Sequence, residues 1–253
     1  MQEGVPSVCI ILLWLFVSDS LFLGLRDVRR FHTEASIPFF PFDFPDTPAY
    51  QAMVNQDALE KAAKHARTPA GKRVNFEKLG ISSPFIAPWN SLLQTDVFYV
   101  LRGSRVQQLL PSTHRVQRSA VLQPSVRLQW VPRSPSARLD SSILVRVAIK
   151  MARRGSPMEH AMIYAIRQSD LSAYHSASDW YGTELHDDHT VVGYLTSGIF
   201  SFIRGRGSGV GFVVANQIQQ IQRVQQTGNS SVIVLIRNTT SLFLRPAFAT
   251  ICS

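Results

Sequence analysis

The chain has 253 residues, enough for one large domain or two small ones with a sizeable buried core. Its hydrophobic fraction of 45% is that of a globular protein, which excludes disorder along the whole chain. The two cysteines, Cys9 and Cys252, indicate no disulfide framework, no CxxC metal site and a reducing compartment.

The net charge of +9 is concentrated in one stretch of the sequence. Residues 101–154 hold eleven lysines and arginines, ten of them arginine, against a single acidic residue, Asp140. Arginine offers a planar fork that suits phosphate, so a block of this kind indicates a polyanionic partner. We favour nucleic acid as that partner. The alternative is a solvated linker, since basic blocks are often disordered.

The N-terminal run Val8–Val17 consists of ten apolar residues, the length of a signal-peptide core. The residues before it include Glu3 and no lysine or arginine, and no small-residue cleavage site follows. Because the run is also too short to span a bilayer, a buried strand or helix is favoured over the alternative of a secretory signal. No membrane association is expected.

A proline-rich stretch and a helix come next. Residues 36–48 hold four prolines, which predict an extended connector. Thr47 followed by Pro48 is a helix-start signal, so a helix is predicted over residues 49–67. Pro69 and Gly71 would end it.

The region after this helix is predicted to be an ordered basic loop. Residues 72–93 are broken by prolines and a glycine, but Phe76, Phe85 and Trp89 recur as large anchors, and Phe85 and Trp89 are expected to pack rather than to stack on bases. Residues 96–101 are typical of a strand. In the basic stretch that follows, 104–110 could form a short helix, and 123–140 is interpreted as a linker or exposed insertion because of its prolines.

The C-terminal part is predicted to be rich in β-strands. Apolar alternation predicts strands at 142–151, 159–166, 191–196, 199–203, 210–215, 232–237 and 242–250. Ile218, Ile221 and Val224 form one stripe of a helix at 216–226. Turns are expected at Ser197-Gly198 and at the glycine run Gly205–Gly209. The fold class is therefore α+β, with a helix-plus-loop N-terminal segment followed by an antiparallel β-barrel or sandwich.

We divide the chain into four segments, with the boundary at residue 24 placed where the family resemblance described below begins. They are an apolar N-terminal segment (1–23), a connector with helix and basic loop (24–93), an arginine-rich linker (94–141) and a β-rich domain (142–253).

The sequence motifs give little support for a catalytic, metal or cofactor site. His186–His189 reads HDDH, which lacks the spacing of HExxH and is accounted for by a polar loop. His160 is expected to be a satisfied buried histidine within a strand, and Ser197 does not sit in a GxSxG elbow. The alternate glycines from Gly205 do not match GxGxxG, and a strand rather than a helix follows them. No cofactor, metal or catalytic residue is predicted.

Three stretches resemble the largest protein subunit of eukaryotic ribonucleases P and MRP. The first is DFPDTPAY at 43–50, with GLRD ahead of it at 24–27. The second is KRVNFEKLGISSPFIAPWNSLL at 72–93, which is similar to a basic KRxNYxKLGxxxPFxxPW signature. The third comprises RGSPMEHAMIYA (154–165), VVGYLTSGIFSFIRGRGSGVGFV (191–213) and VIVLIRNTTSLFLRPAFATI (232–251).

The resemblance implies a non-catalytic, RNA-binding scaffold in a ribonucleoprotein where RNA performs the cleavage. It implies roles in tRNA 5′-leader removal and pre-rRNA processing, and a nuclear, chiefly nucleolar, location. The implied partners are the structured non-coding RNA, other protein subunits and, indirectly, pre-tRNA. The expected RNA contacts are Lys72, Arg73, Lys78, Arg102, Arg105, Arg115, Arg118, Arg204 and Arg206.

Two points qualify this resemblance. Family members are longer and carry a basic N-terminal portion, and residues 1–23 match the family poorly, so a truncated sequence with incomplete RNA binding is expected. GYLTSGxFS is also similar to the barrel of folate-dependent aminomethyltransferases of the glycine cleavage T-protein group. An enzyme of that group, or a generic RNA-binding module, is therefore the alternative.

Overall fold

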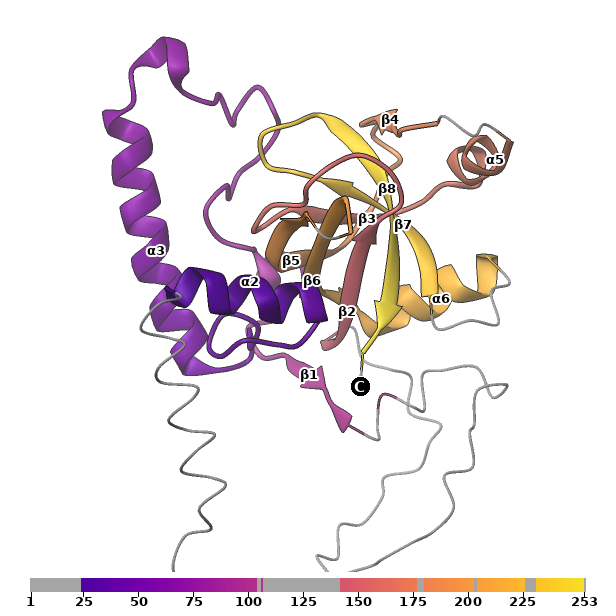
Figure 1. Cartoon of the computed structure of the whole chain (residues 1–253), viewed down its shortest axis with the longest axis horizontal. Helices are drawn as coiled ribbons and strands as arrows, with labels where there is room; N and C mark the ends of the chain where they lie inside the picture. Colours follow the sequence, from indigo (N-terminus) through magenta and orange to yellow (C-terminus); the bar gives the residue numbers. More distant parts are fainter. Residues whose placement is uncertain are drawn as a thin grey trace, which may run out of the picture.

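The computed structural model describes residues 24–103, 106, 142–176, 180–202, 204–225 and 231–252 (Figure 1). The helices are α2 (Leu25–Ala35), α3 (Pro48–Arg67), the 3-10 turn η1 (Ala70–Lys72), α4 (Trp89–Leu93), α5 (Gln168–Ser176) and α6 (Ala215–Gln225). The strands are β1 (Tyr99–Leu101), β2 (Ile143–Met151), β3 (Met162–Ala165), β4 (Thr183–Glu184), β5 (Val191–Ser201), β6 (Arg206–Val214), β7 (Ser231–Arg237) and β8 (Phe243–Ile251).

The C-terminal strands close into an antiparallel barrel. The order runs β2-β6-β5-β3-β7-β8, and β8 pairs back onto β2. Strand β1 extends the sheet by pairing parallel to β2, and β4 adds to β8. The predicted α+β class with an antiparallel barrel is therefore confirmed.

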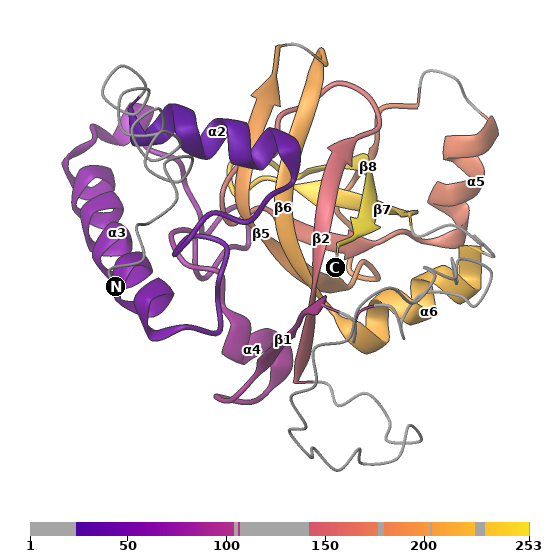
Figure 2. The ribbon, with the colours of Figure 1, turned by 60° about the horizontal axis from the view of Figure 1, so that its bottom comes forward.

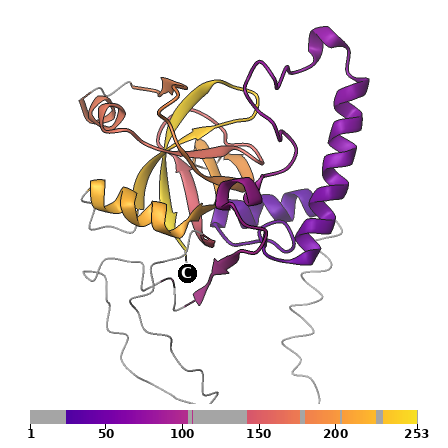
Figure 3. The ribbon, with the colours of Figure 1, turned by 180° about the vertical axis from the view of Figure 1, so that it is seen from behind.

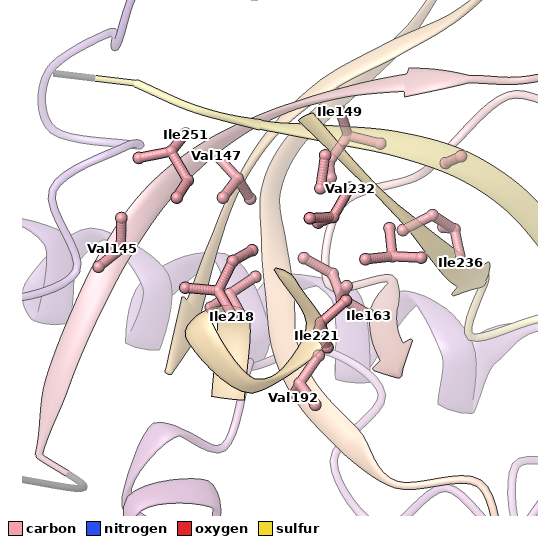
Figure 4. Packing of buried hydrophobic residues seen from close by; sticks show 14 of the residues in the cluster. Val145, Val147, Ile149, Ile163, Val192, Ile218, Ile221, Val232, Ile236 and Ile251 are labelled. Atoms are coloured by element: carbon pink, nitrogen blue, oxygen red, sulfur yellow. The ribbon is translucent and has the colours of Figure 1, made fainter. Parts of the chain in front are cut away.

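The barrel interior is filled by branched aliphatic side chains from every wall strand (Figure 4). Ile163 and Val234, for example, are fully buried. Helix α6 contributes Ile218 and Ile221 to the same cluster, as its three-residue stripe predicts, whereas Val224 is exposed. Burial of these apolar groups is the main source of the barrel's stability.

The N-terminal segment covers the outer face of β2 and β6. Phe212 and Val214 point outward from β6 into a second cluster with Tyr50 and Trp89. The indole of Trp89 makes edge-to-face contacts with the rings of Tyr194 and Phe212, at centroid distances of 5.4 and 6.2 Å. Trp89 is thus a packing anchor, as expected. Figure 2 shows α2 lying beside β5 and β6.

The glycine-rich stretch forms one long hairpin, so the expected turn at Ser197-Gly198 is wrong. Strand β5 runs through these residues with a β-bulge between Leu195 and Ser197. The turn comes after Ser201, where Gly205 adopts a positive φ of 63°. The following glycines lie inside β6, and a Cβ on Gly207 would approach Pro157 and the Gly155 carbonyl within 2.5 Å. They serve close backbone approach rather than a turn.

Other elements also differ from the sequence-based expectation. Residues 36–48 turn rather than run extended, because the Asp43 carboxylate accepts a hydrogen bond from Phe39 N (2.9 Å) and Asp43 N donates to Phe39 O (3.0 Å). Helices α2 and α5 were not predicted. Strand β3 begins only at Met162, because His160 has a φ of 60° that an extended strand cannot accommodate. The predicted 104–110 helix falls outside the described residues, apart from Val106.

Candidate nucleic-acid interface

A polar joint at the β5 bulge fixes the N-terminal segment on the barrel. Asp43 is almost fully buried and accepts hydrogen bonds from the hydroxyls of Thr196 (2.5 Å) and Ser197 (2.8 Å). Arg29 of α2 donates to Thr196 O and Ser197 Oγ, both at 3.1 Å, and its guanidinium lies 3.8 Å from the centroid of the Phe42 ring. Ser197 therefore holds a structural joint.

Helix α3 leaves the barrel surface after its first turns. Thr47 caps it by accepting from Tyr50 N, which confirms the predicted start. Only Tyr50 and Val54 are buried along α3, and Leu59 is 73% exposed. Figures 1 and 3 show the remainder of the helix standing out beside the barrel. We call α3 and the loop that follows it, residues 48–86, the arm.

One ion-pair cluster ties the middle of the arm to the barrel. Lys61 lies 3.0 Å from Glu159, which also pairs with Arg29 at 2.7 Å. Burial opposes ionisation of Glu159, but Arg29 and Lys61 outweigh it and hold its pKa below the usual value. Burial, helped by Lys61, lowers the pKa of the neighbouring His160 to about 4. Among the residues that the structure describes, His160 Nδ1 is buried without a hydrogen-bond partner, so the expected satisfied histidine is wrong.

The end of the arm carries a group of exposed cations, which we call the basic tip: Lys64, Arg67, Lys72, Arg73 and Lys78. Those in the last turn of α3 also suit the negative end of the helix dipole. Glu60 and Glu77 lie among them, so the tip has a moderate net positive charge. The sequence singled out Lys72, Arg73 and Lys78 but missed Lys64 and Arg67, which a helix predicted to end at residue 67 places beside them.

Arg73 has a structural task at this tip. Its Nε and Nη2 donate to Thr68 O at 3.1 and 2.9 Å, and Nη2 also reaches Ala66 O. These carbonyls lie at the C-terminus of α3, where backbone acceptors lack partners within the helix, so Arg73 caps this end. Lys72 and Lys78 are exposed, and their ammonium groups form no hydrogen bond or ion pair with the described residues.

The loop of the arm returns to the barrel through aromatic packing and one buried arginine. Phe76 packs edge-to-face on Phe85 and against His65. Arg237 of β7 is 2% exposed and donates to Leu79 O and to Ser241 O. The barrel thereby fixes the loop that presents the basic tip. The sequence did not indicate that Arg237 anchors this loop, because it shows only a single arginine at the end of an apolar strand.

An open groove of about 910 Å³ runs beside the arm. It is lined by aromatic rings of the connector and by cations of α2 and α3: Arg29, Phe39, Phe42, Lys61, Lys64 and Arg67, with Asp57, Glu60 and Glu159. Because Lys64 and Arg67 also belong to the basic tip, groove and tip form one continuous surface.

The remaining predicted contacts are dispersed. Arg102 forms a two-pronged ion pair with Asp46, at 2.7 and 2.5 Å, next to the start of α3. Arg204 and Arg206 are exposed at the β5–β6 turn, as expected. Arg105, Arg115 and Arg118 lie outside the described residues. The structure therefore groups Lys72, Arg73 and Lys78 and leaves the others apart.

The HDDH stretch forms an ion-pair network. His189 Nε2 lies 3.1 Å from Asp170 of α5, and Arg167 bridges Asp170 and Asp188. Arg167 holds the pKa of Asp170 below its usual value despite the opposing effect of burial. Among the described residues, no cluster of three or more His, Cys, Asp or Glu could hold a metal ion. None of the described helices is long and apolar enough to cross a membrane.

Two family models match the chain. The POPLD (NUC188) domain matches residues 5–89, so the similarity begins before Gly24, where the motif resemblance starts. The POP1 C-terminal domain matches residues 143–189 and 182–253, which form the barrel.

Curated relatives also match the chain. "Ribonucleases P/MRP protein subunit pop1" of Schizosaccharomyces pombe is 25% identical over 212 residues, covering 78% of this chain and 25% of the relative. The Saccharomyces cerevisiae subunit POP1 is 23% identical over 264 residues, covering 76% and 30%. The human subunit POP1 is 42% identical over 71 residues, covering 28% and 7%. The chain thus spans less than a third of these relatives, and nothing in them favours the aminomethyltransferase alternative.

Proposed function

The chain belongs to the Pop1 family of ribonuclease P/MRP protein subunits, and from that premise we propose that it is an RNA-binding scaffold of this ribonucleoprotein. It acts in tRNA 5′-leader removal and pre-rRNA processing and supplies no catalytic residue, because the RNA performs the cleavage. Its partners are the structured RNA and other protein subunits, with pre-tRNA bound indirectly. Its location is the nucleus, chiefly the nucleolus.

The observation that carries the proposal is the pair of family matches. One covers the segment that bears the arm and the other covers the barrel that holds the arm in place. The structure consists of two parts that differ physically. The barrel is closed and filled by apolar side chains, whereas the basic tip of the arm is exposed to solvent.

The basic tip and its groove are suited to phosphate. Exposed lysines act as point charges toward a sugar–phosphate backbone, and their neutralisation of phosphates releases counterions. Arg73 differs, because its guanidinium already bonds the end of α3. We therefore assign direct contacts to Lys64, Lys72 and Lys78, and assign to Arg73 the placement of the tip. Arg102, Arg105, Arg115, Arg118, Arg204 and Arg206 are further proposed contacts.

Co-purification of RNA tests this function. The tagged 253-residue chain is expressed in eukaryotic cells, isolated, and its bound RNA sequenced. We expect enrichment of the ribonuclease P and MRP RNAs. A Lys64→Ala/Lys72→Ala variant should recover less of them. A matched control, Arg30→Ala/Arg223→Ala, removes two exposed charges from α2 and α6 and should recover as much as the unaltered chain.

The outcomes are distinct. Recovery of abundant RNA without enrichment of these two species would reduce the chain to a generic RNA-binding module. Recovery of no RNA would contradict the scaffold function for this chain. Saturable binding of tetrahydrofolate, measured by calorimetry, would instead support the aminomethyltransferase alternative.

A further inference from the structure

The tip of the β5–β6 hairpin exposes two aromatic rings next to two arginines. Phe202 is 78% exposed and Phe200 is 36% exposed, and their rings meet edge-to-face with centroids 5.4 Å apart. Arg204 and Arg206 are exposed on the same turn. Figure 2 shows this hairpin projecting beyond the barrel wall. Exposed aromatic rings on a projecting turn lose the burial that normally stabilises them, so they indicate a contact surface.

Contacts on either side of the turn hold the hairpin. Arg204 N donates to Ser201 Oγ at 3.2 Å, and Ser201 pairs with Arg206 across the hairpin. Behind the turn, Gly207 packs so closely on Pro157 that a side chain has no room there. These contacts therefore hold the hairpin that carries the two rings.

The charged groups of the hairpin itself are of one sign. Between His189 and the last residue the sequence holds no aspartate or glutamate, while Arg204 and Arg206 lie on the hairpin itself. The hairpin base contacts the β2–β3 loop, in which Gly155 follows the exposed Arg154. The one acidic group of that loop, Glu159, is already paired with Arg29 and Lys61.

We propose that this hairpin tip binds unpaired nucleotides of RNA, with Phe202 stacking on a base and Arg204 and Arg206 contacting the flanking phosphates. The inference rests on the proposed RNA-binding function and adds a stacking contact for unpaired bases to it. Aromatic side chains recognise unstacked bases, whereas bases inside a duplex are already stacked on each other. An apolar protein partner fits less well, because a specific protein interface buries about 800 Å² on each partner and this tip offers two rings.

Two RNA probes separate stacking from charge. The affinity of the 253-residue chain is measured by fluorescence anisotropy for a labelled single-stranded oligoadenylate and for an RNA duplex of equal length. Phe202→Ala should weaken oligoadenylate binding about 5- to 150-fold and leave duplex binding within about twofold. Phe202→Tyr should keep the affinity, and Phe202→Leu should lose it, because leucine is apolar but cannot stack. Arg204→Ala/Arg206→Ala should weaken both probes and reduce the salt dependence of both.

Controls make the result decisive. Phe31→Ala removes another exposed ring, on α2, and should change neither affinity. Thermal unfolding of each variant confirms that it is folded. Unchanged oligoadenylate binding by Phe202→Ala, or full binding by Phe202→Leu, would overturn the stacking proposal while the basic tip could still bind RNA. Failure of the unaltered chain to bind either probe would overturn both proposals.

Discussion

The barrel and the arm are stabilised by different interactions. The barrel buries aliphatic side chains on the inside of every wall strand, and β6 is buried on both of its faces. The arm buries only Tyr50 and Val54 along α3 and depends on a cap, ion pairs and a few anchors. Packing fixes the barrel, whereas local hydrogen bonds and ion pairs hold the arm and leave the lysines of its basic tip exposed to a ligand.

The largest contrast is expected between a core and an arm substitution. Ile163→Ala removes fully buried atoms from the barrel and should lower the free energy of unfolding by about 2–5 kcal/mol. Leu59→Ala shortens an exposed side chain on α3 and should change it by less than about 0.5 kcal/mol. Urea unfolding of both variants measures the difference, and equal losses would show that α3 is packed in solution.

Arg237 tests the anchor between the two regions. Arg237→Met removes hydrogen bonds from a charged donor to Leu79 O and Ser241 O, and should cost about 2–3 kcal/mol. Hydrogen exchange should accelerate in the arm's loop around Leu79 more than in β2 and β6. Arg223→Met, at an exposed position of α6, is the control. Uniform acceleration in barrel and loop would contradict an anchor confined to the arm.

The ion-pair cluster where arm meets barrel predicts a pH dependence. The pKa of His160 falls from 6.5 to about 4 on folding, so between these values the unfolded chain binds more protons than the folded one. The contribution of His160 to the free energy of unfolding is therefore present at neutral pH and is lost as the pH falls through this window. The expected loss is roughly 2 kcal/mol between about pH 7 and pH 4.5. His160→Gln should flatten the decline of the urea midpoint over this range. An equally steep decline in the variant would assign it to other groups.

The smallest effect on stability is expected at the basic tip. Lys64→Ala/Lys72→Ala removes two exposed ammonium groups that form no ion pair with the described residues, and should change the unfolding free energy by less than about 0.5 kcal/mol. Thermal unfolding measures this. A loss above about 1 kcal/mol would mean that the lysines support the arm.

The sequence predicted those elements whose cause is local. Thr47 and Pro48 indicate the start of α3, and Ile218 and Ile221 indicate the buried face of α6. Alternation identified the barrel strands, because one of their faces must be apolar. The family matches confirm the recognition made from motifs, whereas the segment boundaries proposed from sequence remain a prediction.

Features that depend on distant partners escaped prediction. Ser197-Gly198 has turn composition, but it lies within β5, where the Ser197 hydroxyl donates to Asp43, 154 positions away. Arg73 escaped prediction for another reason: an arginine in a basic loop indicates phosphate binding, whereas its guanidinium donates to Thr68 O and Ala66 O at the end of α3. The contacts predicted at Arg105, Arg115 and Arg118 remain predictions outside the described residues.

The salt dependence of RNA binding tests the division between scaffold and arm most directly. Affinity of the unaltered chain for ribonuclease P RNA is measured over a series of salt concentrations, together with Lys64→Ala/Lys72→Ala and the matched control Arg30→Ala/Arg223→Ala. The basic-tip variant should flatten the slope of log affinity against log salt by up to ~0.7 per lost contact on single-stranded segments, and the control should keep the slope. A basic-tip variant with an unchanged slope, or a control that loses as much, would contradict this division between scaffold and arm.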